Sequence, residues 1–129
     1  MRVLFLNFHG SCSTAASGDP TVSNETGASI ELAQTAVYAD RIMPYSEMNC
    51  DTLRAFIGTA QPDQRMGIAM GRVVAHELYH VLLQTGRHSN KGIAKAIYSP
   101  AALLGRSLRF EAGELEKIRE KYALAPRLR

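Results

Sequence analysis

Residues 63–85 read DQRMGIAMGRVVAHELYHVLLQT, and no other part of the chain is as informative about its architecture. Apolar side chains recur in it at four-residue spacing, and two valines widen the stripe: Met66, Met70, Val74, Leu78, Leu82, Val73 and Val81. This spacing brings the apolar residues to one face of an α-helix. The stretch therefore predicts a long amphipathic helix with one buried side, and Gly86 stands where a left-handed residue would end it.

The chain before this helix has the composition of strands and one loop. Residues 2–8 are rich in β-forming residues and predict a first strand. Residues 30–38 alternate in part between apolar and polar side chains, which predicts a further strand, and strand structure is expected to run on to about Met48. Pro44 cannot donate a backbone hydrogen bond, so we expect it at a sheet edge or a bend. Residues 10–27 are dense in Ser, Thr, Gly, Asn and Asp and predict a loop.

Short helices are expected on both sides of the long one. Residues 51–57 predict a short helix that is capped by Asn49 or Asp51 and ends before Gly58. Ser99-Pro100 has the pattern of a helix start, and residues 110–122 predict a terminal amphipathic helix. The chain has 129 residues, 46% of them hydrophobic, and no internal repeat. We therefore expect one α+β domain over residues 1–129.

The charge of the chain is unevenly distributed. The formal net charge is +3, with −3 over residues 1–86 and +6 over residues 87–129. In the terminal helix the basic residues alternate with acidic ones, which favours a solvated helix face with paired charges. We therefore expect no nucleic-acid partner, and a basic nucleic-acid-binding domain is the least favoured alternative. No apolar run approaches the roughly 18 residues of a membrane span, so none is expected.

The two cysteines, Cys12 and Cys50, are either a disulfide or two free thiols. A disulfide between them would close a loop of about 39 residues and stabilise the fold by roughly 4 kcal/mol on the chain-entropy model. It would favour a secreted or periplasmic location, whereas free thiols would favour the cytoplasm.

The chemistry of the chain is concentrated in the long helix, where His76-Glu77-Leu78-Tyr79-His80 has the pattern HExxH. Positions i and i+4 of a helix lie one turn apart on the same face, so His76 and His80 can converge on one metal ion. Glu77 is adjacent to the first histidine, where a carboxylate can act as general base toward a water activated by the metal.

A third histidine, His88, follows the helix within a span of thirteen residues that begins at His76. A turn at Gly86 would let the chain return toward the ligand face, so His88 is the favoured third ligand. Imidazole suits zinc as a ligand, which supports this choice. Glu111 and Glu114 are the alternatives, although carboxylates there would also suit the start of a helix. His9 is expected to be a structural or surface residue.

These residues resemble the HExxH zinc metallopeptidases, the zincins, and in particular the metzincin branch, whose motif is HExxHxxGxxH. The spacing here is HExxHx7H, and no methionine follows Met70, so Ala94 occupies the position of the methionine that metzincins carry beneath the metal. A closer resemblance is to small bacterial zincin-like proteins with AHELxH, TxxHS and GIMxAxWSxxDL segments. The matching residues are 75–80, 85–89 and 92–103, within about 35 residues of this chain.

The resemblance implies a minimal zincin-like fold with a small twisted mixed sheet, an active-site helix and a C-terminal helix. It implies a Zn²⁺ ion held by His76, His80 and His88 and hydrolysis of peptide bonds with Glu77 as general base. By the same likeness, a peptide or protein substrate would lie antiparallel along an edge strand between residues 36 and 45. Tyr98 could donate a hydrogen bond to the developing oxyanion, the alternative being an aromatic side chain packed under the helix.

A second class of function remains open. The same scaffold could serve as a zinc-binding or regulatory module without catalysis, in which case a fourth protein ligand would close the metal site. The short chain also leaves few residues for a second lobe that would wall a substrate cleft. We therefore expect a shallow cleft, or one completed by a second copy of the chain or a partner chain.

Overall fold

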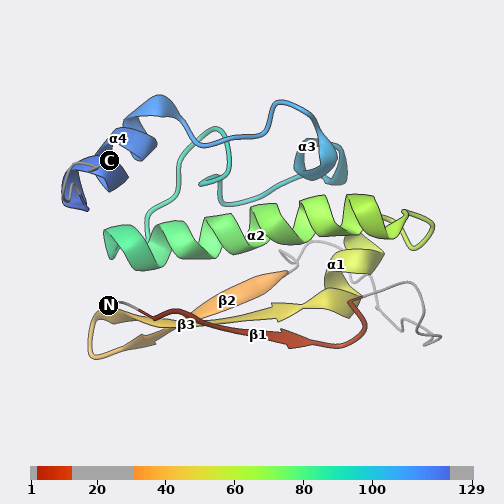
Figure 1. The fold of residues 1–129 in the computed structure, drawn as a ribbon, viewed down its shortest axis with the longest axis horizontal. Helices are drawn as coiled ribbons and strands as arrows, with labels where there is room; N and C mark the ends of the chain where they lie inside the picture. The colour runs from red at the N-terminus through yellow and green to blue at the C-terminus, as the bar shows by residue number, and fades with distance from the viewer. Residues whose placement is uncertain (1–2, 13–30, 123–129) are drawn as a thin grey trace, which may run out of the picture.

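The computed structural model describes residues 3–12 and 31–122, and it confirms the expected α+β fold class. Figure 1 shows the elements of these residues, three strands and four helices: β1 (Phe5–His9), β2 (Ala33–Tyr38), β3 (Arg41–Asn49), α1 (Cys50–Ile57), α2 (Asp63–Leu83), α3 (Pro100–Leu104) and α4 (Ala112–Lys121). Most of the loop expected at 10–27 lies outside the described residues.

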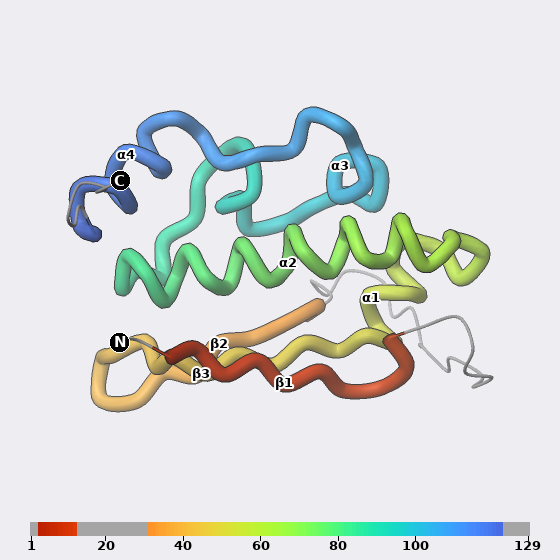
Figure 2. The backbone as a smooth tube through the Cα atoms, viewed as in Figure 1, coloured from red at the N-terminus to blue at the C-terminus, as the bar shows by residue number. Residues whose placement is uncertain are grey.

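The described elements form three layers. The sheet has the order β1-β3-β2, with β1 parallel and β2 antiparallel to the central strand β3. The long helix α2 runs across one face of this sheet, and α3, α4 and the loops between them lie on the opposite side of α2 (Figures 1 and 2). Because α2 is the middle layer, it has a buried surface toward both neighbours.

This middle position explains which residues of α2 are buried. Met66 and Val73 of the expected stripe are buried, whereas Leu78 and Leu82 are only half-buried because the small sheet covers them in part. The hydrophobic core lies where α1, α2 and α3 meet the sheet, and its residues are Met48, Cys50, Leu53, Ile57, Met66, Ala69, Val73 and Leu103.

Pro44 lies in the central strand, so the expected edge position is wrong. The structure tolerates it because the ladder between β1 and β3 begins only at the next residue, with Phe5 opposite Tyr45. On the other side, the register of β2 shifts between Thr35 and Val37, opposite this part of β3. The missing amide proton of Pro44 therefore falls where both neighbouring ladders are interrupted or absent.

The strand expected across residues 36–45 is also corrected. A hairpin turn through Ala39 (φ 49°) and Asp40 (φ 62°) divides it into the end of β2 and the start of β3. Two left-handed residues in succession are typical of a tight hairpin connection. The edge strand beside α2 is therefore β2 alone, which begins at Ala33.

The starts of α1 and α3 agree with the sequence-based expectation, whereas the end of α2 differs from it. Of the two candidate caps, Asn49 is the one that caps α1 through its side chain, and Ser99 caps α3 before Pro100 as expected. The left-handed residue after α2 is Gln84 (φ 50°) and not Gly86. The Gln84 side-chain amide bonds to both backbone groups of Ile42 in β3, which offsets the cost of a left-handed non-glycine residue.

Cys12 and Cys50 form a disulfide. The bond ties the chain just after β1 to the first residue of α1, and the side chain of Cys50 is fully buried in the core. Of the two states that the sequence leaves open, the structure therefore shows the bridged one, which mildly favours an oxidising compartment.

Candidate metal centre

His76 and His80 lie one turn apart on α2, and their Nε2 atoms are 3.1 Å from each other. Each ring is fixed by its other nitrogen: Nδ1 of His76 donates to the carbonyl oxygen of Ile93 at 2.6 Å, and Nδ1 of His80 donates to that of Thr85 at 2.6 Å. Both imidazole side chains are buried. Backbone carbonyls of the two following loops thus set the tautomer and orientation of both rings, as is usual for metal-binding histidines.

The tautomers of His76 and His80 leave the lone pairs of their Nε2 atoms directed at each other. With the protons on Nδ1, each neutral ring presents an unprotonated Nε2, and two acceptors at 3.1 Å have no proton to share. A cation bound between them would remove this repulsion. Tetrahedral zinc with Zn–N bonds of about 2.05 Å holds two nitrogens about 3.3 Å apart, so the observed spacing fits such an ion.

The loop after α2 brings His88 to the same place. Its ring centroid is 4.8 Å from that of His80 and 5.2 Å from that of His76. One ligand nitrogen from each of the three histidines lies within 4.8 Å of the others, which is close enough to hold one metal ion. Unlike the other two, His88 is exposed and forms the solvent side of the group.

Local contacts hold the loop that carries His88. The amide of Ser89 donates to the carbonyl of Ala94 at 2.9 Å, and the Ser89 hydroxyl donates to the carboxylate of Glu114. Glu114 is buried, and its other oxygen accepts the backbone amide of Glu111 at 2.9 Å in the capping box of α4. Glu114 thus stabilises the loop that carries His88 through the hydroxyl of Ser89. Among the described residues, neither Glu111 nor Glu114 belongs to the group of possible metal ligands.

The electrostatic environment keeps His76 and His88 neutral. Burial lowers the pKa of His76, and burial together with the neighbouring His80 and His76 lowers the pKa of His88. Both rings are therefore unprotonated at neutral pH, which is the form that binds a metal.

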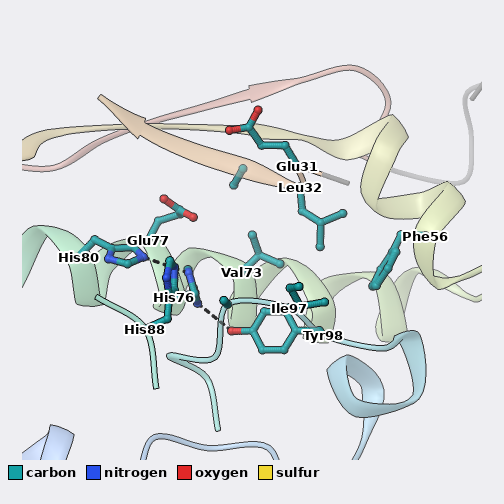
Figure 3. A pocket seen from close by; sticks show the side chains of 12 residues that line it. Glu31, Leu32, Phe56, Val73, His76, Glu77, His80, His88, Ile97 and Tyr98 are labelled. Atoms are coloured by element: carbon teal, nitrogen blue, oxygen red, sulfur yellow. Dashed lines mark hydrogen bonds between the residues drawn. The ribbon is translucent and has the colours of Figure 1, made fainter. Parts of the chain in front are cut away.

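Glu77 is buried on α2 and lines the same cavity as the three histidines. Its Oε2 atom accepts a hydrogen bond of 2.5 Å from the hydroxyl of Thr35 in β2, and that hydroxyl lies 2.7 Å from the hydroxyl of Ser46 in β3. Figure 3 shows the carboxylate directed from the helix toward the sheet, beside the imidazole cluster. A carboxylate in this position can exchange protons with a molecule held between the histidines and β2.

Tyr98 lies behind His76. Its hydroxyl is 2.9 Å from Nδ1 of His76 and donates to the carbonyl oxygen of Ile93, so it faces the side of the ring opposite Nε2 (Figure 3). Burial, with smaller contributions from Glu77 and Glu114, raises the pKa of Tyr98, which keeps the hydroxyl protonated. This position fits the packing alternative and a role in orienting His76, and does not fit direct contact with an oxyanion.

The loop under His76 depends on a glycine. Gly92 has φ 75°, and a Cβ atom there would lie 2.3 Å from the carbonyl oxygen of Arg109. The next residue, Ile93, donates its amide to that same carbonyl at 3.1 Å and offers its own carbonyl to His76. Ala94, which follows Ile93, is fully buried.

Several supporting groups were missed by sequence reasoning. The carbonyls of Ile93 and Thr85 act through the backbone, so their side chains carry no signal of this role. Thr35 and Ser46 lie on separate strands far from the HExxH motif in sequence, and only the sheet register brings them together. The position of Ser46 on the inner face of a strand that is otherwise apolar there was a usable hint.

A cavity of about 590 Å³ extends from the histidines along α2 toward α1. Beyond the polar end its walls are apolar and include Ala33 and Ala96. Figure 3 shows the side chains of four further apolar residues that line it, Leu32, Phe56, Val73 and Ile97. One wall comes from the residues at the start of β2 and the other from the loop before α3. The cavity thus combines a metal-ligand group with room for an apolar group.

Among the described residues, no helix combines the length and the hydrophobicity needed to cross a membrane. Comparison of the chain with protein-family models, with curated proteins and with solved structures yields no match.

Proposed function

We propose that this chain is a zinc-dependent peptidase of the zincin type. The observation that carries the proposal is the convergence of His76, His80 and His88 at the end of a cavity that also contains the carboxylate of Glu77. Three imidazoles this close together can bind one zinc ion, and they would leave a fourth position for water or substrate. No carboxylate or thiolate from the described residues joins this group.

The proposed reaction is hydrolysis of a peptide bond. Zinc held by the three histidines would supply Lewis-acid chemistry, lowering the pKa of a water and polarising the scissile carbonyl. Glu77 takes a proton from that water as the water oxygen adds to the carbonyl carbon. The carbon–nitrogen bond then breaks, and Glu77 passes the proton to the leaving amine, so that the carboxylate is regenerated.

The substrate would be an extended peptide with an apolar side chain near the scissile bond. Among the described residues, no strand pairs with the outer edge of β2, so such a peptide could pair there in antiparallel orientation, and β2 borders the cavity. The apolar walls formed by Leu32, Val73 and Ile97 favour an aliphatic or aromatic side chain in the cavity. The disulfide supports a secreted or periplasmic location. A second copy or a partner chain would supply a further wall for the cleft.

The first experiment measures zinc in the purified protein by elemental analysis after expression with added zinc. We expect about one zinc per chain in the native protein. His88→Ala should weaken zinc retention on dialysis against a mild chelator. His9→Ala removes an exposed histidine of β1 and serves as the matched control, with native zinc content. A native chain without zinc would contradict the proposal.

The second experiment separates a peptidase from a zinc-binding module without catalysis. A mixed peptide library is incubated with the zinc-loaded native chain and with Glu77→Gln, and products are identified by mass spectrometry. We expect cleavage beside apolar residues by the native chain alone. Zinc binding without cleavage of any peptide would favour the non-catalytic module, and equal cleavage by Glu77→Gln would exclude Glu77 as the base.

A further inference from the structure

A chain of three hydrogen-bonding side chains connects the proposed base to the centre of the sheet. It begins at Glu77 on α2, passes through Thr35 on the edge strand β2, and ends at Ser46 on the central strand β3. Ser46 is 2% exposed and Glu77 is 8% exposed, so the serine end is buried in the sheet and the carboxylate meets solvent only through the cavity that it lines. Thr35 and Ser46 are directly opposite each other in the register of the sheet.

The proton inventory fixes the direction of these bonds. A threonine hydroxyl has one proton, and Thr35 donates it to Oε2 of Glu77. The contact between the two hydroxyls therefore has Ser46 as donor and Thr35 as acceptor. A hydroxyl that already accepts a hydrogen bond is a stronger donor, so the buried serine strengthens the bond from Thr35 to the carboxylate.

The position of Thr35 in its strand is also defined. The regular pairing of β2 with β3 holds up to Thr35, and the register shifts between Thr35 and Val37. Such irregularities change the direction of side chains and are common next to active sites. The neighbouring residue Gln34 points to the opposite face of the sheet and bonds to Glu47 there. Thr35 is thus the hydroxyl of β2 that the sheet presents to the helix.

We propose that Thr35 is a positioning residue that holds the carboxylate of Glu77 for catalysis. This inference rests on the peptidase function proposed above. By binding Oε2, the threonine restricts rotation of a flexible side chain and leaves Oε1 free to receive the proton from water. Because Thr35 belongs to the edge strand, a peptide paired with β2 is aligned with the same carboxylate.

The test compares three variants on a peptide that the native chain cleaves. Thr35→Val keeps the shape of the side chain without the hydroxyl, and we expect kcat to fall about tenfold or more with KM within about twofold. Thr35→Ser keeps the hydroxyl and should recover most of the lost kcat. Gln34→Ala alters the next residue of the same strand on the other face and should retain native kcat. Native kcat in Thr35→Val, or an equal loss in Thr35→Ser, would overturn the inference.

A binding measurement supplies a readout that does not depend on peptide cleavage. Acetohydroxamate chelates protein-bound zinc, and its hydroxyl hydrogen-bonds to a neighbouring carboxylate. We expect calorimetry on the zinc-loaded chains to show affinity weakened about tenfold in Thr35→Val, as in Glu77→Gln, and restored in Thr35→Ser. Native affinity in Thr35→Val would overturn the role of Thr35 even if peptides are cleaved. Weakened affinity in Thr35→Val without cleavage by the native chain would leave Thr35 as positioning residue and overturn the peptidase.

Discussion

The side-chain amide of Gln84 pairs with the backbone of Ile42 in the manner of another peptide unit. Its Oε1 accepts the Ile42 amide at 3.2 Å, and its Nε2 donates to the Ile42 carbonyl at 2.8 Å. The same Nε2 also donates to the carbonyl of Val81 in the last turn of α2. The Gln84 side chain thus links the end of α2 to the central strand β3. The next residue is Thr85, whose carbonyl orients His80.

Replacement of Gln84 should therefore weaken both the fold and the metal site. Gln84→Ala removes the bonds to Ile42 and leaves a left-handed alanine, and we expect the free energy of unfolding to fall by about 1–2 kcal/mol. Chemical denaturation measures this change, and a competing zinc chelator measures the expected loss of zinc affinity. Gln84→Gly relieves the backbone strain without restoring the bonds, so it should lie between the native chain and Gln84→Ala. Equal stability of all three would show that the amide contributes nothing.

The stability of the metal-free chain should depend on pH through His76 and His88. Burial lowers the pKa of His76 and of His88 below the value of about 6.5 that histidine has in an unfolded chain. Below that pH the unfolded state binds more protons than the folded state. The free energy of unfolding is therefore highest above pH 6.5, as far as these two histidines determine it, and it falls as the pH decreases below that value.

Denaturation of the zinc-free chain at pH 7.5 and at pH 5 measures this dependence. The free energy of unfolding should be lower at pH 5, and His76→Gln should reduce the difference because its side chain does not titrate. A free energy that is higher at pH 5 than at pH 7.5 would have the opposite sign to that expected.

The disulfide should contribute strongly to the stability of so small a domain. Its cysteines are 38 positions apart, and a crosslink of that span restricts the unfolded chain by about 4 kcal/mol on the entropic model. We expect reduction, or the double variant Cys12→Ser with Cys50→Ala, to lower the free energy of unfolding by up to this amount. Zinc binding should survive wherever the chain remains folded, because Cys12 and Cys50 are outside the histidine group. A reduced chain as stable as the oxidised one would contradict the entropic account of the disulfide.

The sequence was sufficient for the features that depend on local pattern. The four-residue spacing in residues 63–85 predicted α2. The candidate caps Asn49 and Asp51 and the pair Ser99-Pro100 predicted where two shorter helices begin, and the structure selects Asn49 of the first two. The clustering of His76, His80 and His88 was predictable because helix geometry and one short loop suffice to bring the three side chains together. Here local geometry and tertiary structure lead to the same result.

The features that depend on strand pairing could not be predicted from local sequence pattern. Pro44 was expected at an edge because sequence alone does not reveal which strands flank it or where their ladders begin. Gln84 replaced Gly86 as the left-handed residue because a partner in β3, distant in sequence, compensates its backbone strain. The link from Thr35 to Glu77 spans 42 positions and exists only once the register of β2 is set.

Gly92 provides a test of the loop that orients His76, with a second glycine as control. Gly92→Ala forces a Cβ atom against the carbonyl of Arg109 in a left-handed conformation, which displaces Ile93 and its bond to His76. We expect zinc affinity to fall at least about tenfold, since groups that orient metal ligands typically contribute that much. Gly86→Ala lies in the same connection, where a Cβ atom meets no neighbour within 4 Å, and should bind zinc as the native chain does. A chelator competition assay with both variants decides the matter, because native zinc affinity in Gly92→Ala would mean that the Ile93 carbonyl is not needed to hold His76.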